Sequence, residues 1–284
     1  MASPSSASPR SPSSPLPSSS SSPASLPQTL WGLQIPLHIT HTSQPTTAPF
    51  ITSVPRFGYL ALLLPRLSAY FGAPCSSFHH EHVQLRNLAL GLLVDLYQPQ
   101  ALPWRLVVGD GPEWDIADTF MNSAKEADFV RHGNAKQIMS LSKGNTTALW
   151  NAVQDNDYGA FAKINYHLLN APIALRNVPL RIYIPSSPPS AKTSGGGDDD
   201  AAAAAGSFKV MQTLVQPRLS NRASQTLGVA LKNILPALFP SSRDPVLANV
   251  VLHGAPVPFK APLEELMREA SYPDGWLCLV VVLL

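Results

Sequence analysis

Residues 121–133, MNSAKEADFVRHG, carry one lysine, Lys125, in a stretch whose apolar spacing predicts a helix. A lysine amine can attack a thioester and form an isopeptide bond, provided that the donor's active site desolvates and deprotonates it. Lys125 also fits a plain surface position, because acidic residues precede it and Asp128, at i+3, could pair with it. The local chemistry therefore leaves an acyl acceptor and an ordinary surface lysine both open. The apolar stripe expected beside it comprises Trp114, Ala117, Phe120, Met121 and Ala124.

No other group of side chains in the sequence has the spacing of an active site or a metal site. The segment SSFHHEHVQL holds His79, His80 and His82 beside Glu81. Neighbours on a strand alternate faces, and no distant Cys or His lies at ligand spacing, so we expect a solvated turn. SLSK (140–143) lacks the second element of a serine hydrolase, and GGGDDD lacks the Lys-Ser/Thr of a phosphate loop. The sequence predicts a protein that is not an enzyme and that needs no metal or other cofactor.

Composition and charge further narrow the possible classes of protein. The chain has 284 residues, a net charge of +2 and 13% charged residues, too weak a balance for a nucleic-acid partner. Cys75 and Cys278 form no CxxC motif, which fits a reducing compartment where thiols stay free and structural. The start of the chain lacks the apolar stretch of a secretory signal. WLCLVVVLL at the other end is shorter than the roughly 20 residues of a membrane helix, so we expect a buried strand.

The order of predicted elements outlines three folded regions behind a Ser/Pro-rich start. Residues 1–28 bury nothing that offsets their ordering entropy, so we expect them to be disordered. The middle, 113–170, has helical periodicity, with Asp157 expected to cap its last helix and one of residues 145–147 its third. The low-complexity stretch 186–207 indicates a flexible insertion. Elsewhere we expect strands at 29–40, 59–65, 102–109, 178–185, 208–216, 246–254 and 275–284, and helices at 85–98, 225–238 and 263–270.

The order strand, strand, helix, strand occurs at both ends of the chain. It is the order of the ubiquitin-like β-grasp fold, so the predicted class is α+β, with two ubiquitin-like β-grasp domains flanking a helix-rich domain. The predicted boundaries are 29–110 for domain A, 111–172 for the helical domain and 173–284 for domain B. The chain ends in VVVLL inside a predicted strand, without the exposed terminal glycine of a ubiquitin-like modifier. In such chemistry we therefore expect an acceptor or a scaffold and not a donor.

Several segments together resemble the autophagy-related protein 5 family in its fungal form. They are LLLPRLSAYFG, LALGLLVDLY followed by LPWRLVVG, FMNSAKEADFVRHGNAKQIMSLSK, LWNAVQDNDYGAFAKIN, PLRIYIP and SYPDGWLCLVVV. Each segment alone would be a weak signal, but they occur in the family's order from about Trp31 to the end, interrupted only at 186–207. The Ser/Pro-rich start and this insertion do not match the family, so nothing functional is carried onto them.

The resemblance implies a scaffold of autophagy. It implies that Lys125, in the AKEAD segment, is the isopeptide acceptor of the ubiquitin-like autophagy-related protein 12, delivered by transiently bound conjugating enzymes. It also implies a groove for an amphipathic helix of the coiled-coil autophagy-related protein 16. The assembled E3-like complex would promote lipidation of autophagy-related protein 8 during autophagosome assembly. The chain would be cytoplasmic and peripheral at the preautophagosomal structure membrane.

Arg66 and Trp31 are the candidates for that groove. Arg66 follows a buried apolar run and a proline, and the resemblance puts this segment near the groove. Arg66 also fits a solvated position at a strand end, and Trp31 fits a core or lid position at the start of the folded region. The rival interpretation of the whole chain is a ubiquitin-like adaptor that docks partner helices and is never conjugated.

Overall fold

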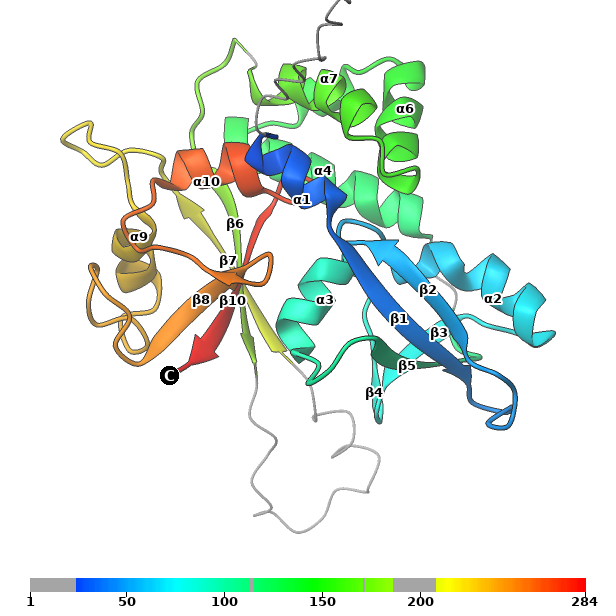
Figure 1. Ribbon diagram of the computed structural model, residues 1–284. Helices are drawn as coiled ribbons and strands as arrows, with labels where there is room; N and C mark the ends of the chain where they lie inside the picture. Colours follow the sequence, from blue (N-terminus) through cyan, green and yellow to red (C-terminus); the bar gives the residue numbers. More distant parts are fainter. Residues whose placement is uncertain (1–23, 113–114, 171, 186–207) are drawn as a thin grey trace, which may run out of the picture.

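Two sheet-containing domains flank a bundle of helices (Figure 1). The computed structural model describes residues 24–112, 115–170, 172–185 and 208–284. The disorder expected for residues 1–23 and the flexible insertion expected at 186–207 lie outside these residues. The α+β fold class is as the sequence predicts.

Domain A is a five-stranded mixed sheet in the order β2-β1-β5-β3-β4. The first and last strands, β1 and β5, pair in parallel, and the other neighbours are antiparallel. Ile35, Leu37 and Ile39 on β1 are buried while the residues between them are not, which is the period of two expected for a strand with one buried face. The elements are β1 (Gln34–His41), β2 (Phe50–Pro55), η1 (Leu60–Leu63), α2 (Leu64–Phe71), β3 (Ser77–His80), β4 (Val83–Gln84), α3 (Leu90–Tyr97) and β5 (Trp104–Gly109).

The strand predicted at 59–65 is wrong, because these residues form the 3-10 helix η1 and the start of α2. Pro65 stands in the first turn of α2, where its missing N–H costs nothing, and Gly72, at φ 61°, ends the helix. A short, wholly apolar run does not distinguish a buried strand from a buried helix. The second strand of domain A is β2, which the apolar pattern does not reveal.

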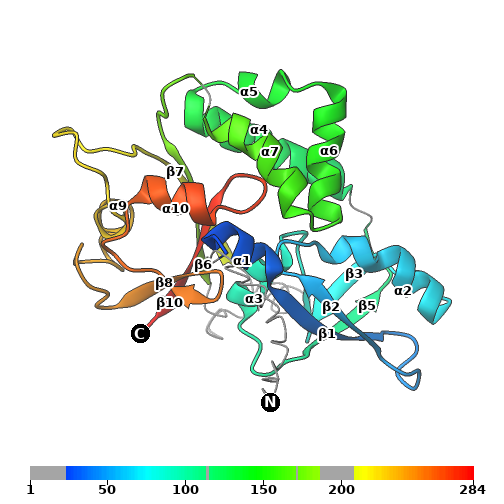
Figure 2. The same ribbon diagram turned by 45° about the horizontal axis from the view of Figure 1, so that its top comes forward.

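Helix α1 (Leu26–Gly32) precedes β1 and corrects two expectations. The strand expected at 29–40 begins only at Gln34, and Trp31 lies on the helix. The disorder expected for 1–28 also extends too far, since α1 begins at Leu26, with Pro27 in its first turn, and Leu30 and Trp31 are buried. In Figures 1 and 2, α1 lies between β1 of domain A and the end of α10 in domain B.

Domain B repeats the strand order of domain A, as β7-β6-β10-β8-β9, again with its first and last strands parallel. Both domains are therefore β-grasp units, as predicted. The apolar C-terminal run forms β10 at the centre of this sheet, and in the described part of the chain no helix has the length and hydropathy of a membrane span. The elements are β6 (Val178–Pro185), β7 (Phe208–Val215), α9 (Leu227–Ile234), β8 (Ala248–Leu252), β9 (Ala255–Pro256), α10 (Leu263–Ala270) and β10 (Leu277–Leu283).

The helical domain comprises α4 (Ile116–His132), α5 (Lys136–Met139), α6 (Lys143–Gln154) and α7 (Tyr158–Leu169). Asp157 caps α7 as predicted, because its carboxylate accepts a hydrogen bond from the backbone N–H of Ala160 at 3.0 Å. The cap predicted for α6 at 145–147 is wrong. Ser142 caps that helix, and its Oγ accepts from the backbone N–H of Asn145 at 3.2 Å.

The buried apolar residues form two clusters. One lies within domain A, between its sheet and helices, and includes Leu37, Leu67 and Trp104. The other is continuous through α1, the helical domain and domain B, and it reaches Phe57 and Tyr59 of domain A. The helical domain and domain B are therefore packed as one body.

Candidate functional site

Lys125 lies on the solvent face of α4 with Asn122 and Phe129. Its Nζ donates a weak hydrogen bond to Oδ1 of Asn122 at 3.4 Å. The ion pair expected with Asp128 is wrong, because Asp128 is on the buried face, where its Oδ2 accepts from the backbone N–H of Ile138 at 3.1 Å. In the described part of the chain Lys125 makes no ion pair, and its side chain is exposed to solvent.

The opposite face of α4 packs on the rest of the protein. Phe120 and Ala124 of the predicted apolar stripe are buried, whereas Trp114 lies outside the described residues. Near the end of the helix Arg131 is buried and donates to the carbonyl oxygen of Gly275 at 3.0 Å. Burial lowers the pKa of this guanidinium to about 10. Gly275 has φ +85°, and a Cβ there would overlap Arg131, so the loop before β10 fits α4 only with glycine.

The turn of α4 that contains Lys125 is bonded to domain B. The carbonyl oxygen of Ser123 accepts from Nε1 of Trp276 at 2.9 Å, and its hydroxyl donates to Asp274 Oδ2 at 2.7 Å. Arg181, on β6, donates to Ser123 Oγ at 3.0 Å and to Glu126 Oε2 at 2.7 Å. Burial raises the pKa of the Asp274 carboxyl, and the Arg181 guanidinium opposes this shift. Ser123 and Glu126, on either side of Lys125 in the sequence, thus form hydrogen bonds with residues of domain B.

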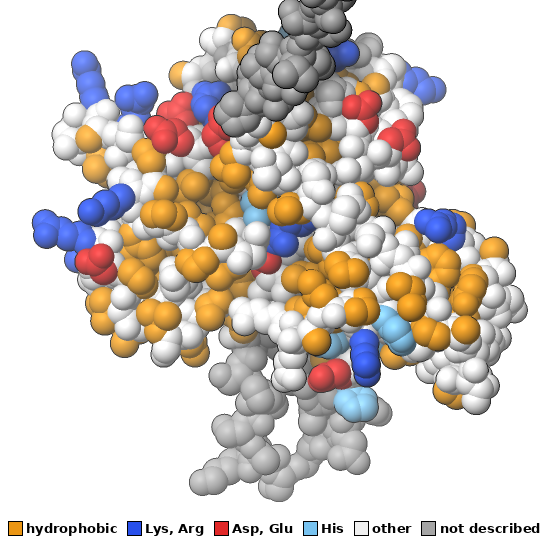
Figure 3. All heavy atoms as spheres, in the orientation of Figure 1, with side chains coloured by type: hydrophobic (Ala, Val, Ile, Leu, Met, Phe, Trp, Pro, Cys, Tyr) orange, Lys and Arg blue, Asp and Glu red, His pale blue; other side chains and the backbone are white. Residues whose placement is uncertain are grey.

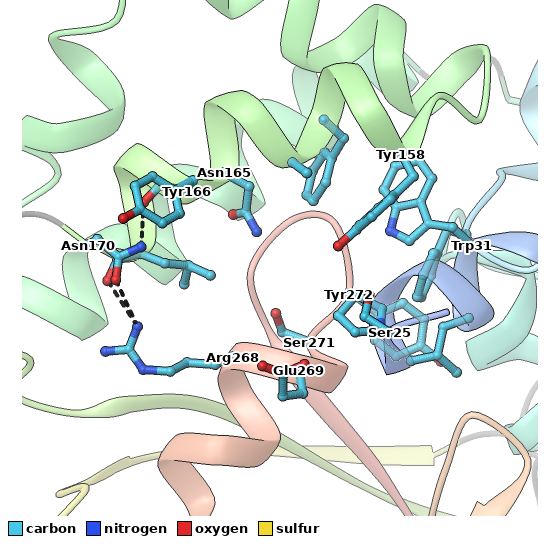
Figure 4. Close-up of a pocket in the computed structure, with 16 residues that line it drawn as sticks. Ser25, Trp31, Tyr158, Asn165, Tyr166, Asn170, Arg268, Glu269, Ser271 and Tyr272 are labelled. Carbon is cyan, nitrogen blue, oxygen red and sulfur yellow. Dashed lines mark hydrogen bonds between the residues drawn. The ribbon is translucent and has the colours of Figure 1, made fainter. Parts of the chain in front are cut away.

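A hollow of about 310 Å³ lies between α1, α7 and the end of α10 (Figure 4). Trp31 forms one wall, with its ring centroid 4.7 Å from Phe161, 5.5 Å from Phe57 and 5.9 Å from Tyr158. Asn156 donates to the carbonyl oxygen of Trp31 at 3.1 Å and ties α1 to the helical domain. All three domains therefore contribute to the hollow, which has the aromatic walls typical of a helix-binding groove.

The rim of the hollow is polar and includes residues that the sequence interpretation missed. Arg268 on α10 pairs with Glu264 at 3.1 Å and approaches Oδ1 of Asn170 at 3.4 Å. Tyr166 on α7 lines the hollow while 64% exposed. The only sequence signal for these residues is the aromatic pair Tyr158 and Tyr166 on one predicted helix, because the approach of α10 depends on tertiary structure.

Arg66 does not line this hollow. It lies exposed on α2 of domain A, with its guanidinium 5.4 Å from the ring centroid of Phe50. Trp31 is buried, in the core-or-lid position weighed from the sequence, and also forms a wall of the hollow. The structure thus separates the two groove candidates, and a groove role for Arg66 stays a prediction.

The histidine-rich segment is a hairpin, so the expected solvated turn is wrong for part of it. His79 and His80 are half-buried on β3, and His80 Nδ1 accepts from Nε1 of Trp104 at 3.2 Å. Among the described residues no group of three or more His, Cys, Asp or Glu could hold a metal.

Cys75 and Cys278 are free and buried, and burial raises the pKa of both thiols. On the face shown in Figure 3, hydrophobic side chains are interspersed with polar ones over both sheet domains, and Lys and Arg side chains project at the left edge and also lie near the middle of the view.

A polar cluster joins the two sheet domains next to the hollow. Arg56, after β2, pairs with Asp95 on α3, and Arg56 Nε lies 3.4 Å from Nδ1 of His253 in domain B. His253 Nε2 lies 2.8 Å from the carbonyl oxygen of Ala270, and its ring packs edge-on against Phe57. Burial lowers the pKa of His253 to about 4. This cluster holds the wall residue Phe57 in place.

These features define a multidomain ubiquitin-like protein that presents an exposed lysine and a hollow with aromatic walls. Three family models match the chain: Autophagy protein ATG5, UblA domain, over residues 30–109, its alpha-helical bundle region over 113–171 and its UblB domain over 177–281. The chain therefore belongs to the autophagy protein 5 family and is a protein of autophagy.

Relatives and a solved structure agree with this assignment. Autophagy protein 5 of Chaetomium globosum is 75% identical over 259 residues, which cover 91% of this chain and 90% of the relative. Autophagy-related protein 5 of Neurospora crassa is 77% identical over 265 residues, covering 92% of this chain and 72% of the relative. The crystal structure of Kluyveromyces marxianus Atg5 is similar in fold, with a TM-score of 0.67 at 18% identity, over 90% of this chain and 99% of that one.

Proposed function

We propose that Lys125 is the isopeptide acceptor of the ubiquitin-like autophagy-related protein 12. The observation that carries the proposal is the exposed amine on α4, which has no ion pair in the described part of the chain while the turn beneath it is bonded to domain B. A conjugating enzyme would supply the thioester and deprotonate the amine, so the chain acts as a substrate at that step and not as a catalyst.

The hollow between α1, α7 and α10 is the proposed site for an amphipathic helix of the coiled-coil autophagy-related protein 16. Its aromatic walls would bury the apolar face of the helix, and Arg268 and Asn170 would face polar positions at the rim. Lys125 does not line the hollow, which supports separate surfaces for the covalent partner and the helix.

In this proposal the chain is the non-catalytic scaffold of an E3-like complex. The complex would promote lipidation of autophagy-related protein 8 at the preautophagosomal structure membrane, where this otherwise cytoplasmic chain would be peripheral. The proposed units are domain A at 29–110, the helical domain at 111–172 and domain B at 173–284. Helix α1, which begins at Leu26, belongs with the folded part.

The alternative is an unconjugated ubiquitin-like adaptor that uses only the hollow. A denaturing gel of the protein from its own cells separates the two functions. A covalent increase in mass by one small ubiquitin-like protein is expected for the acceptor. A single unshifted band, in cells where autophagy has been induced, contradicts conjugation and leaves the adaptor.

A further inference from the structure

The turn of α4 around Lys125 is fixed by domain B through interactions that converge on one arginine. Arg181 is on β6, an inner strand of the domain B sheet between β7 and β10, and its side chain is 13% exposed. Its guanidinium stacks on Trp276, 3.9 Å from the ring centroid. Gln212, turned so that its amide oxygen faces this group, accepts from Nε at 2.7 Å. Arg181 is therefore held in one orientation before it reaches α4.

The two remaining nitrogens of Arg181 reach α4 on either side of the lysine in sequence. Nη1 donates to Ser123 Oγ at 3.0 Å, and Nη2 pairs with Glu126 at 2.7 Å. Ser123 is also bonded to Asp274 and Trp276. Residues 123 and 126 are thus held by domain B, while among the described residues the Lys125 amine makes only the long bond to Asn122.

We propose that Arg181 is a positioning residue for acyl transfer to Lys125, an inference that rests on the proposed acceptor function. In that step the neutral amine attacks the thioester carbon, a C–N bond forms and the C–S bond breaks. The thiolate leaves, and the proton lost by the amine completes the thiol. Reaction requires the amine to meet the carbonyl at about 3–3.5 Å in one direction, so a fixed helix turn favours it. Domain B, which supplies no reacting atom, sets the place of the nucleophile.

The test is single-turnover transfer from a conjugating enzyme already loaded with the ubiquitin-like protein, using the full chain at a series of concentrations. Arg181→Ala should lower the maximal rate by about 10- to 100-fold, the effect of misplacing a reacting group by about 1 Å. The concentration at half-maximal rate should stay the same, because Arg181 is mostly covered and touches no donor. Arg105→Ala, an exposed arginine on a strand of domain A, is the matched control and should react like the parent.

A conservative substitution distinguishes positioning from general destabilisation. Arg181→Lys keeps a positive charge beside Glu126 and Asp274 and should recover part of the rate that Arg181→Ala loses. Glu126→Gln removes only the 60% exposed member of the pair and keeps the fold, so it serves if Arg181→Ala does not fold. It should lower the same maximal rate. If folded Arg181→Ala reacts at the parental rate, the proposal is overturned. If Arg181→Ala does not fold, a parental rate in Glu126→Gln overturns it.

Lys125→Arg in the same series distinguishes a failure of the positioning role of Arg181 from a failure of the proposed acceptor function of Lys125. If the parent chain forms no conjugate, or Lys125→Arg still forms it, the acceptor function is wrong. If the parent reacts at Lys125 and the Arg181 and Glu126 variants react equally fast, only the positioning role is wrong.

Discussion

Arg56 and Asp95 form a buried ion pair, with Nη2 of Arg56 2.5 Å and 2.6 Å from the two carboxylate oxygens. Both residues belong to domain A, and their side chains are 7% and 2% exposed. Asp95 also accepts from the backbone N–H groups of His253 and Gly254, in the turn between β8 and β9. A pair internal to domain A thus anchors a turn of domain B.

Asp95→Ala should lower the free energy of unfolding by about 3–5 kcal/mol, because it leaves the charge of Arg56 buried without a partner. Urea unfolding followed by tryptophan fluorescence measures this. Glu264→Ala is the control, since it breaks the more exposed pair with Arg268 and should cost only about 0.2–1 kcal/mol. Equal losses in the two variants would contradict the role given to the buried pair.

The stability of the protein should fall as the pH drops from about 6.5 to 4. The pKa of His253 is about 4 when folded and about 6.5 when unfolded, so in this window the unfolded chain binds more protons. The free energy of unfolding therefore rises with pH here, and the loss at pH 4 reaches about 3 kcal/mol for this residue. Thermal melts across the window should show a smaller dependence in His253→Asn, since asparagine tolerates φ 53°. His82→Asn, at an exposed turn, is the control and should keep the parental dependence of melting temperature on pH. If His253→Asn keeps it as well, the effect belongs to other groups.

Lys125→Arg should abolish the covalent increase in mass while leaving the melting temperature unchanged. Arginine keeps the charge and the helix propensity but is not an acyl acceptor at neutral pH. Lys136→Arg and Lys143→Arg, at exposed positions of the same domain, are the controls, with Lys192→Arg for the insertion. Conjugate that persists in Lys125→Arg and disappears in a control would move the acceptor to that position.

Tyr166→Ala should weaken binding of the amphipathic partner helix by about tenfold or more, as removal of an aromatic anchor does. Calorimetry with the isolated helix peptide measures it. Phe129→Ala removes an exposed aromatic side chain from α4, away from both the hollow and α2, and should bind like the parent. Arg66→Glu in the same series asks whether the groove extends to α2, and an unchanged affinity would remove Arg66 from it. Equal binding by Tyr166→Ala would place the helix elsewhere.

Removal of residues 1–23 should leave both the melting temperature and conjugation unchanged. Removal of 1–28 should lower the melting temperature, because it deletes the first turn of α1 and loosens Leu30 and Trp31 from the core. Differential scanning fluorimetry of the two truncations provides the comparison. Identical melting temperatures would mean that α1 contributes nothing to the fold.

Much of domain B could be predicted because its strands and helices differ in their pattern. The helix at 263–270 has the predicted bounds, and β10 is the buried strand expected from its length and composition. Domain A was predicted less well, because residues 59–65, which form η1 and the start of α2, are as uniformly apolar as a buried strand, and because β2 is a half-exposed edge strand. Fold class depends on the order of elements, so one misassigned helix did not change it.

Sequence patterns predict the candidate site only in part, because some of its contacts depend on tertiary packing. The position of Lys125 on an exposed face follows from helical spacing. Its relation to Arg181 does not, because 55 positions separate Arg181 from Glu126 and only the packing of α4 on β6 brings them together. Asp128 shows the converse. Spacing predicts a surface pair, whereas the approach of α5 turns the carboxylate into a partner for the Ile138 backbone.

The division of the buried residues into two clusters has a consequence for how the chain opens. The inner core of domain A, between its sheet and its helices, can open locally while Phe57 and Tyr59 stay in the core that the helical domain and domain B have in common, so the amide protons of its strands can exchange with solvent by a route of their own. The helical domain has no such freedom, because α4 and β6 share one interior. Any opening that exposes Phe120 also disturbs the strand that contains Arg181, so the turn of Lys125 and this arginine persist, or are lost, together.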